Sequence, residues 1–170
     1  MNTGNSAHSS SASSDAKREL LRHTLATLAY RGGKALRNAP SGFSEFRAGE
    51  GLRTPGQILA HIGDLLDWGL SIVKGKREWH DSKPLPWEQG VERFFDALKK
   101  FDDFLASNEP LQAPPEKVFQ GPVADALTHV GQIAMLRRLA GAPVKGESYY
   151  VADIETGRVG TDQPKPNREF

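Results

Sequence analysis

Four stretches of the chain carry large apolar residues at three- and four-residue steps, which is the spacing of one face of an α-helix. The first predicted helix runs from Asp15, a suitable N-cap, to about Asn38. Gly32 and Gly33 continue its apolar face, although two glycines in a helix cost about 2 kcal/mol relative to two alanines. We therefore expect either that another helix approaches closely at this pair or that the helix bends there. The rest of this apolar face consists of Leu21, Leu25 and Leu28.

The boundaries of the other three helices are marked by capping residues. Thr54-Pro55-Gly56-Gln57 supplies an N-cap, a proline in the first helical position and a glutamine in the third, and the helix that it opens should end near Val73. A third helix is predicted from Pro86 to Ser107. A fourth opens at Gly121-Pro122 and stops at Gly141, because glycine is typical of the position just after a helix.

An amphipathic helix cannot bury its apolar face alone, whereas four helices packed together can. The sequence therefore predicts an all-α fold, a four-helix bundle over residues 15–160. An extended C-terminal segment should pack on the bundle through its large apolar and aromatic residues. Residues 1–14, which are rich in serine, are expected to be a mobile tail, and residues 161–170 a surface tail. The residues expected to pack the extended segment are Tyr149, Tyr150, Val151 and Ile154.

Composition narrows the classes of partner and compartment. The 22 Lys and Arg residues nearly balance the 21 Asp and Glu residues and are scattered along the chain, so we expect no nucleic-acid partner. No apolar run approaches the ~20 residues that a membrane-spanning helix needs, and the N-terminus lacks the pattern of a secretory signal. The absence of cysteine excludes disulfides, thiolate zinc sites and cysteine nucleophiles, and suits a cytoplasmic protein.

Three polar residues form a candidate metal site. His61 lies three residues after Ile58 and four before Leu65, so it should point toward the interior. Asp125 and His129 are one helical turn apart and can present an oxygen and a nitrogen to one point. With His61 as third ligand, a zinc, nickel or iron ion would keep open positions for water or substrate, as catalytic metals do. The alternative is that each histidine makes one hydrogen bond and that the helix dipole alone favours Asp125.

Other polar residues near these positions allow more than one role. Gln132 could bind a metal-bound water or fix a neighbouring helix, and we favour the second role. Asp64 could orient the free ring nitrogen of His61, but that contact is awkward within one helix, so we expect Asp64 to be exposed. Arg137 and Arg138 fit an anionic substrate and a solvated helix end equally well.

Two stretches carry a resemblance to a known family. One is His129-Val-Gly-Gln-Ile, followed by Leu136-Arg-Arg-Leu-Ala-Gly and Pro143-Val-Lys-Gly-Glu-Ser-Tyr-Tyr, and the other is Thr54-Pro-Gly-Gln-Ile-Leu-Ala-His61. They are similar to the last core helix, with its following loop, and to the start of the second helix of the DinB-like (YfiT-type) superfamily. The resemblance extends from about Asp15 to Gly160.

The resemblance implies a four-helix bundle in which a divalent metal is held by a histidine of the second helix and by two residues one turn apart in the last core helix. His61 and His129 match two of these positions. Asp125 stands where the family most often has histidine and in some members glutamate, and aspartate has the shorter reach.

The function implied by the resemblance is that of a metal-dependent enzyme. A thiol-dependent S-transferase or isomerase is favoured, with a hydrolase as the other reaction class. The expected partners are a small-molecule substrate, such as a low-molecular-weight thiol, and a second copy of the chain in a homodimer. The alternative is a non-catalytic bundle that binds a ligand or dimerises and has a vestigial metal site, which the aspartate at position 125 slightly favours.

Overall fold

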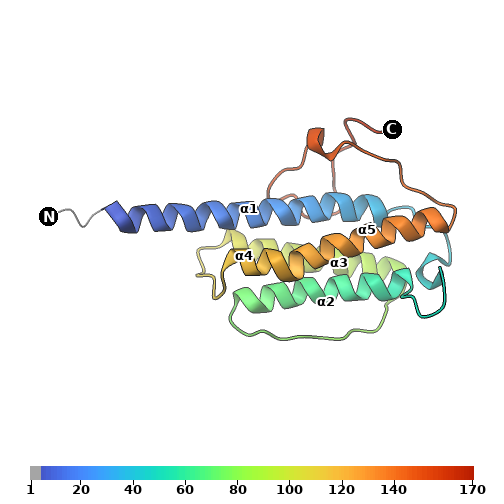
Figure 1. Ribbon diagram of the computed structural model, residues 1–170, viewed down its shortest axis with the longest axis horizontal. Coiled ribbons are helices and arrows are strands. Elements are labelled where there is room, and N and C mark those ends of the chain that lie inside the picture. The colour runs from blue at the N-terminus through green and yellow to red at the C-terminus, as the bar shows by residue number, and fades with distance from the viewer. Residues whose placement is uncertain (1–4) are drawn as a thin grey trace.

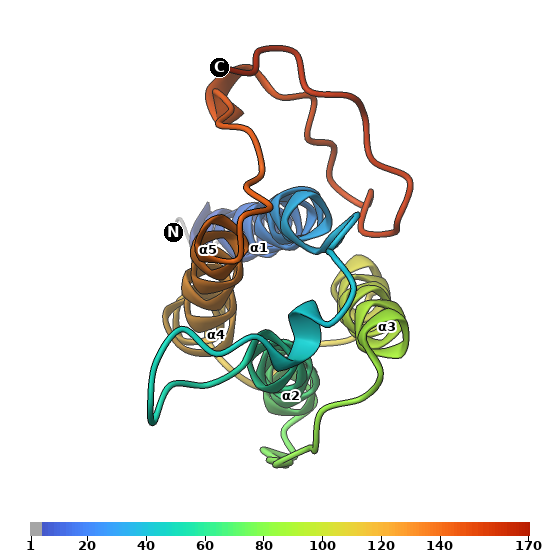
Figure 2. The same ribbon diagram turned by 90° about the vertical axis from the view of Figure 1, so that its right-hand side faces the viewer.

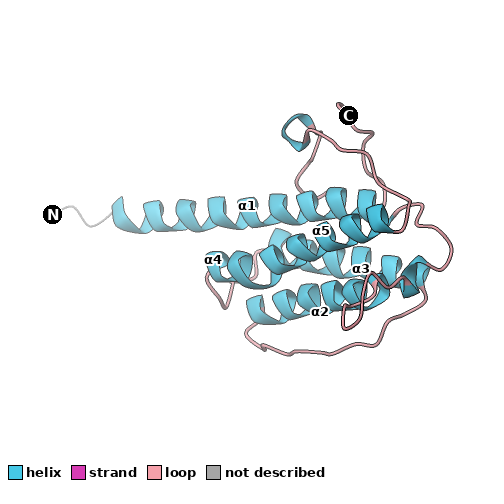
Figure 3. Ribbon diagram, turned by 45° about the vertical axis from the view of Figure 1, so that its right-hand side comes forward, coloured by secondary structure: helices cyan, strands magenta, loops and turns pink. Residues whose placement is uncertain are grey.

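The structure is a computed structural model that describes residues 5–170, and this part of the chain contains helices and loops but no strand (Figure 3). Four long helices pack together, which confirms the predicted all-α architecture. None of the helices in the described range is both long and apolar enough to cross a membrane. The helices are α1 (Asn5–Leu36), α2 (Pro55–Val73), α3 (Trp87–Ala106), the short α4 (Pro115–Val118) and α5 (Ala124–Leu139), with single 3-10 turns at Phe43–Glu45 and Tyr149–Val151.

The four long helices form a ring around one core. Seen along the bundle, α1 and α2 lie on opposite sides, with α3 and α5 between them (Figure 2). Helices α1 and α5 run in one direction and α2 and α3 in the other (Figure 1). Because α2 and α3 are parallel, residues 74–86 must return along the whole length of α2 before α3 can begin.

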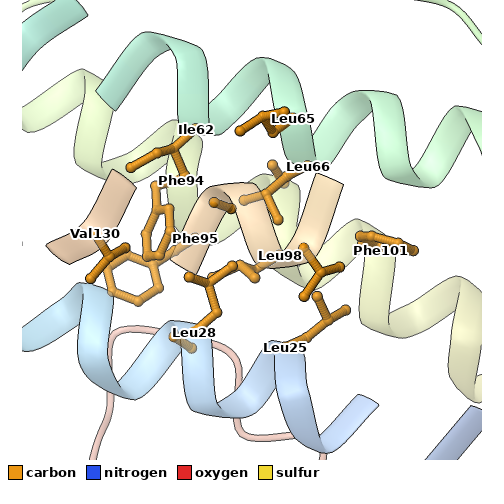
Figure 4. Packing of buried hydrophobic residues seen from close by; sticks show 14 of the residues in the cluster. Leu25, Leu28, Ile62, Leu65, Leu66, Phe94, Phe95, Leu98, Phe101 and Val130 are labelled. Carbon is orange, nitrogen blue, oxygen red and sulfur yellow. The ribbon is translucent and has the colours of Figure 1, made fainter. Parts of the chain in front are cut away.

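The predicted apolar faces meet in this core (Figure 4). The leucines of the first face, the isoleucines and leucines of α2, and the phenylalanines of α3 are buried, so the periodicity correctly indicated which side of each helix faces inward. Helix α2 begins with the predicted capping box, in which the Thr54 side chain accepts from Gln57 N and the Gln57 side chain accepts from Thr54 N. The most completely buried members include Leu25, Leu28, Ile62, Leu66, Phe94, Leu98 and Phe101.

Gly32 and Gly33 mark the place where α3 crosses closest to α1. A Cβ atom on Gly32 would lie 2.5 Å from Cζ of Phe94, and one on Gly33 would lie 3.3 Å from Cζ of Phe95. Of the two expectations for this glycine pair, the close approach of another helix is therefore confirmed, and α1 continues to Leu36.

The predicted N-terminal boundary is wrong. Residues 1–4 of the expected tail lie outside the described residues, but residues 5–14 are the first turns of α1, so Asp15 is inside a helix and does not cap it. This part of α1 projects beyond the other helices (Figure 1). A helix that is already fixed by packing adds each further residue without a new nucleation cost, and serine and alanine tolerate helical geometry well enough for that.

The fourth predicted helix begins earlier than Gly121. Helical structure starts at Pro115 and passes through a π-helical turn at Phe119–Val123 before α5. Pro122 lies inside the π-turn. Proline lacks an N–H and its ring collides with the carbonyl four residues earlier, and a wider turn relieves both problems. Asp125 is consequently ten residues inside a continuous helical segment, where the dipole of the helix N-terminus no longer explains it.

The C-terminal segment is tied back to α1. The fully buried carboxylate of Glu147 accepts hydrogen bonds from Tyr30 Oη at 2.5 Å and from Lys34 Nζ at 2.6 Å. Residues 161–170 were predicted to be a surface tail, but their end returns antiparallel to residues 146–148, and Glu169 also bonds to Lys34. Of the residues predicted to pack this segment, Tyr149 contacts the Tyr30 ring edge-on, whereas Tyr150 is 98% exposed.

Arg137 is a structural residue rather than a substrate ligand. Its side chain is buried and donates hydrogen bonds to four backbone carbonyl oxygens that lie between 2.9 and 3.1 Å away. Three of these carbonyls belong to residues at or just after the end of α1, where helical carbonyls have no partner of their own. Arg138 points to solvent. The carbonyls belong to Ala35, Arg37, Asn38 and Ala142.

Replacing Arg137 by methionine should therefore lower the free energy of unfolding by about 2–4 kcal/mol, because the carbonyls at the end of α1 lose their donors while remaining buried. Arg138→Met is the matched control and should change the free energy by less than about 0.5 kcal/mol. Urea denaturation followed by circular dichroism measures both. Equal effects of the two substitutions would contradict the capping role.

A second pair of variants tests the contact between α1 and α3. Gly32→Ala should destabilise the protein, because overpacking against the buried Phe94 ring costs about 1–3 kcal/mol and exceeds the helix propensity gained. Gly131→Ala in α5 places its Cβ in open space, so it should raise the free energy of unfolding by up to about 1 kcal/mol. Opposite signs in thermal denaturation are expected, and a stabilising Gly32→Ala would rule out the close contact.

Candidate metal centre

His61, Asp125 and His129 come together between α2 and α5. Each offers one ligand atom, and the three atoms lie within 4.8 Å of one another. The antiparallel packing of α2 on α5 places His61 opposite His129, with the two ring centroids 4.8 Å apart and the rings nearly perpendicular. His61 and His129 side chains are 19% and 12% exposed, and that of Asp125 is 49% exposed, so the cluster has one side open to solvent. This group can hold a metal ion.

The tautomer of His129 is set by its neighbour one turn later. Nδ1 of His129 lies 2.8 Å from Oε1 of Gln132, and an amide oxygen can only accept, so Nδ1 carries the proton. Nε2 of neutral His129 is then left with a lone pair that faces the cluster. A partner that fixes the ring in this way is typical of metal-binding histidines. The prediction that Gln132 fixes a neighbouring helix is therefore wrong, because its contact is with its own helix.

Asp125 faces both imidazoles at once. Its Oδ1 atom is 3.5 Å from Nε2 of His129, and its Oδ2 atom is 3.9 Å from Nε2 of His61. Aspartate is thus long enough at this position, although it is shorter than glutamate. Neither distance is that of a good hydrogen bond. Carboxylate oxygens and imidazole nitrogens consequently converge on one small space without good hydrogen bonds between them, and such an arrangement can hold a cation.

The electrostatic surroundings keep His61 in the form that binds metals. Partial burial lowers the pKa of His61 below its ordinary value, and the neighbouring His129 and Arg53 lower that pKa further, against the opposing effects of Asp125 and Asp64. Near neutral pH the His61 ring is therefore uncharged and keeps a nitrogen lone pair.

A tryptophan covers the other side of His61. The Trp79 ring stands edge-on to His61, with centroids 5.7 Å apart, and edge-on to Trp68 at the same distance. Only the return of residues 74–86 along α2 brings Trp79, eighteen positions further in the chain, next to His61.

Asp64 fastens this returning segment, and the prediction that it is exposed is wrong. Its side chain is 1% exposed and accepts hydrogen bonds from Ser82 N at 2.8 Å and Ser82 Oγ at 2.6 Å. Arg93 from α3 forms an ion pair with it at 2.7 Å. Closer to Trp79, the backbone N–H of Glu78 donates to Ser71 Oγ. Asp64 therefore fixes the returning segment beside His61 and does not orient the His61 ring.

The distances among the ligand atoms are close to those that one ion requires. Zinc binds imidazole nitrogen and carboxylate oxygen at about 2.0–2.2 Å, so two ligand atoms of a tetrahedral site lie roughly 3.3 Å apart. The 3.5 and 3.9 Å distances in the cluster are near this value, and the 4.8 Å limit requires side-chain movements of roughly 1 Å.

A groove of about 740 Å³ begins at His129 and is bounded by α5 and the loop before α2. Its volume is in the range of small-molecule binding sites. His129 and Gln132 both line it, so a molecule bound in it would have one end beside one of the candidate ligands. Its walls also include Leu52, Arg53, Ile58, Met135 and Leu139.

Two residues of this site were missed or misjudged from the sequence. Gln132 has a local signal, because a His followed three residues later by an amide places the two side chains side by side on a helix. Trp79 has no such signal, since its position depends on where a long connection runs. The comparisons with known proteins add no further residue: no protein-family model, no curated protein and no solved structure matches this chain.

The role of Asp64 has a pH signature. Burial raises its pKa, but hydrogen bonds from Ser82 and Arg93 outweigh burial, so the pKa of Asp64 is lowered. A carboxylate with a lowered pKa stabilises the folded state above its unfolded pKa of about 4, and this contribution is lost as the pH falls through the folded pKa. Asp64→Asn should therefore cost about 2 kcal/mol or more at pH 7 and progressively less below about pH 4.

Asp67→Asn is the control, because Asp67 pairs with the same Arg93 but its side chain is 34% exposed. It should cost less than about 1 kcal/mol at every pH. Denaturant unfolding of the variants between pH 3 and pH 7 makes the comparison, and a loss for Asp64→Asn that does not change with pH would contradict the charged pairing.

Proposed function

We propose that this protein binds one divalent metal ion through His61, Asp125 and His129 and acts with it on a small molecule. The observation that carries the proposal is the convergence of two imidazole nitrogens and a carboxylate, at distances too long for good mutual hydrogen bonds. Three protein ligands leave room in the coordination shell, which is the pattern of catalytic sites. Such an ion polarises a substrate oxygen, or lowers the pKa of a bound water or thiol.

The chain's own residues account for the rest of the site. Gln132 contacts Nδ1 of His129 and so holds its Nε2 toward the cluster, and Trp79 packs edge-on against His61. His129 also lines the groove along α5, which gives a substrate a route to the site. Asp125, with the most exposed of the three side chains, stands nearest to solvent and is the ligand best placed to exchange with a substrate group.

The resemblance to the DinB-like superfamily supports the choice of reaction class within this proposal. A thiol-dependent transfer or isomerisation is favoured over hydrolysis, with a low-molecular-weight thiol as co-substrate and a homodimer as the assembly. A cytoplasmic location also belongs to the proposal, because the sequence has no cysteine that an oxidising compartment would pair. Zinc, nickel and iron all suit two imidazoles and a carboxylate.

Metal binding is the direct test. Metal-free protein titrated with Zn²⁺, Ni²⁺ and Fe²⁺ in a calorimeter should bind one equivalent. His129→Ala should weaken binding at least about a hundredfold, because it removes a ligand, and Gln132→Leu about tenfold or more, because it removes the partner that orients His129. Ni²⁺ should also quench tryptophan emission, since Trp79 is 5.7 Å from His61.

His80→Ala is the matched control, because it removes an exposed histidine one residue from Trp79 and outside the cluster. It should leave the affinity and stoichiometry unchanged. Wild-type protein that takes up none of the three ions, or a His80→Ala variant that loses as much affinity as His129→Ala, would reject the ligand set. Failure to load would favour the alternative of a non-catalytic bundle with a vestigial site.

A further inference from the structure

The groove beside the candidate metal centre has a polar end and an apolar end. His129 and Gln132 stand at the end nearest the cluster, and Met135 and Leu139 follow on the same helix. Leu139 is ten residues after His129, a distance of about 15 Å along the helix axis. The loop before α2 adds one residue of each kind to the lining: Arg53, which is close enough to His61 to affect it electrostatically, and the apolar Leu52.

Exposed apolar side chains gather on these walls. Leu52, Met135 and Leu139 are 55%, 57% and 58% exposed, although residues of this size are usually covered. Together with the buried Ile58 they line one hollow rather than lying singly over the surface. A contiguous exposed apolar hollow with a few polar groups at one end is typical of a ligand site.

From this arrangement we infer that the substrate is an amphiphilic molecule, with an anionic, oxygen-bearing head at the metal ligands and Arg53, and an alkyl or aryl tail along α5. The inference rests on the proposed function for the head and on the apolar walls for the tail. The length of the groove accommodates a tail of many carbon atoms, and the single arginine at its polar end complements one negative charge. A fully polar substrate would leave the apolar walls in water.

A series of straight-chain hydroxamic acids, from acetohydroxamic to decanohydroxamic acid, tests the inference on zinc-loaded protein by calorimetry. The hydroxamate head binds the ion, and each methylene group that is buried should raise the affinity about twofold to fourfold. Met135→Gln and Leu139→Gln should flatten this dependence on chain length and leave the affinity for acetohydroxamic acid unchanged. Arg53→Gln should lower the affinity equally for all chain lengths.

Leu20→Gln is the matched control, because Leu20 is an exposed leucine of α1 that does not line the groove. It should preserve the full dependence on chain length. If acetohydroxamic acid binds but longer chains bind no better, the amphiphile inference is overturned and the metal centre stands.

If the protein does not load with metal, the straight-chain carboxylates from acetate to decanoate are titrated into metal-free protein. A rise in affinity with chain length that Leu139→Gln abolishes would then support the groove and reject the metal centre. No rise would overturn the inference. In a third outcome, affinity does not depend on ligand chain length, and light scattering shows that Met135→Gln and Leu139→Gln convert a dimer into a monomer. The hollow would then be an interface between two copies of the chain, and the inference would be overturned.

Discussion

The register of α2 against α5 is the constraint on which the candidate site depends. The two helices are antiparallel, so a shift of one turn would separate His61 from His129. A steric contact two turns away sets this register: a Cβ atom on Gly69 would lie 3.3 Å from the Pro122 ring and 2.7 Å from Phe101. Gly69 follows His61 by eight residues and Pro122 precedes His129 by seven, so the contact of a glycine with a proline and the contact of the two imidazoles are parts of one arrangement.

The parallel direction of α2 and α3 determines what surrounds the site. A short turn cannot connect two parallel helices, so residues 74–86 run the length of the bundle and cover one face of α2. Asp64 holds this segment by a buried carboxylate, and the segment in turn places Trp79 on His61. A residue that contacts neither the groove nor the candidate ligands thus fixes the segment that places Trp79 against His61.

Much of the fold could be predicted from the sequence because it is encoded by local spacing. The apolar faces, the capping box at Thr54 and the one-turn spacing of Asp125 and His129 all depend on residues within a few positions of one another. The errors concern residues whose partners are distant. Asp64 pairs with Ser82 and Arg93, 18 and 29 positions away, and Arg137 with carbonyls about 100 positions away. The inward orientation of His61 and His129 suggested that they could meet. Whether they do meet depends on the register of α2 against α5, which local spacing does not determine.

The π-turn before α5 changes the direction of the side chains that follow it relative to those that precede it. One extra residue in a turn rotates everything that follows by about 100° relative to a regular α-helix. Residues 115–118 precede this turn and residues 124–139 follow it, so the number of residues in the turn sets the direction of Asp125 relative to that of the buried Val118. A natural deletion of one residue between Phe119 and Val123 would straighten the segment and force a choice between the packing of Val118 and the direction of Asp125. Homologous chains that keep the carboxylate should accordingly conserve the length of this turn more strictly than its composition.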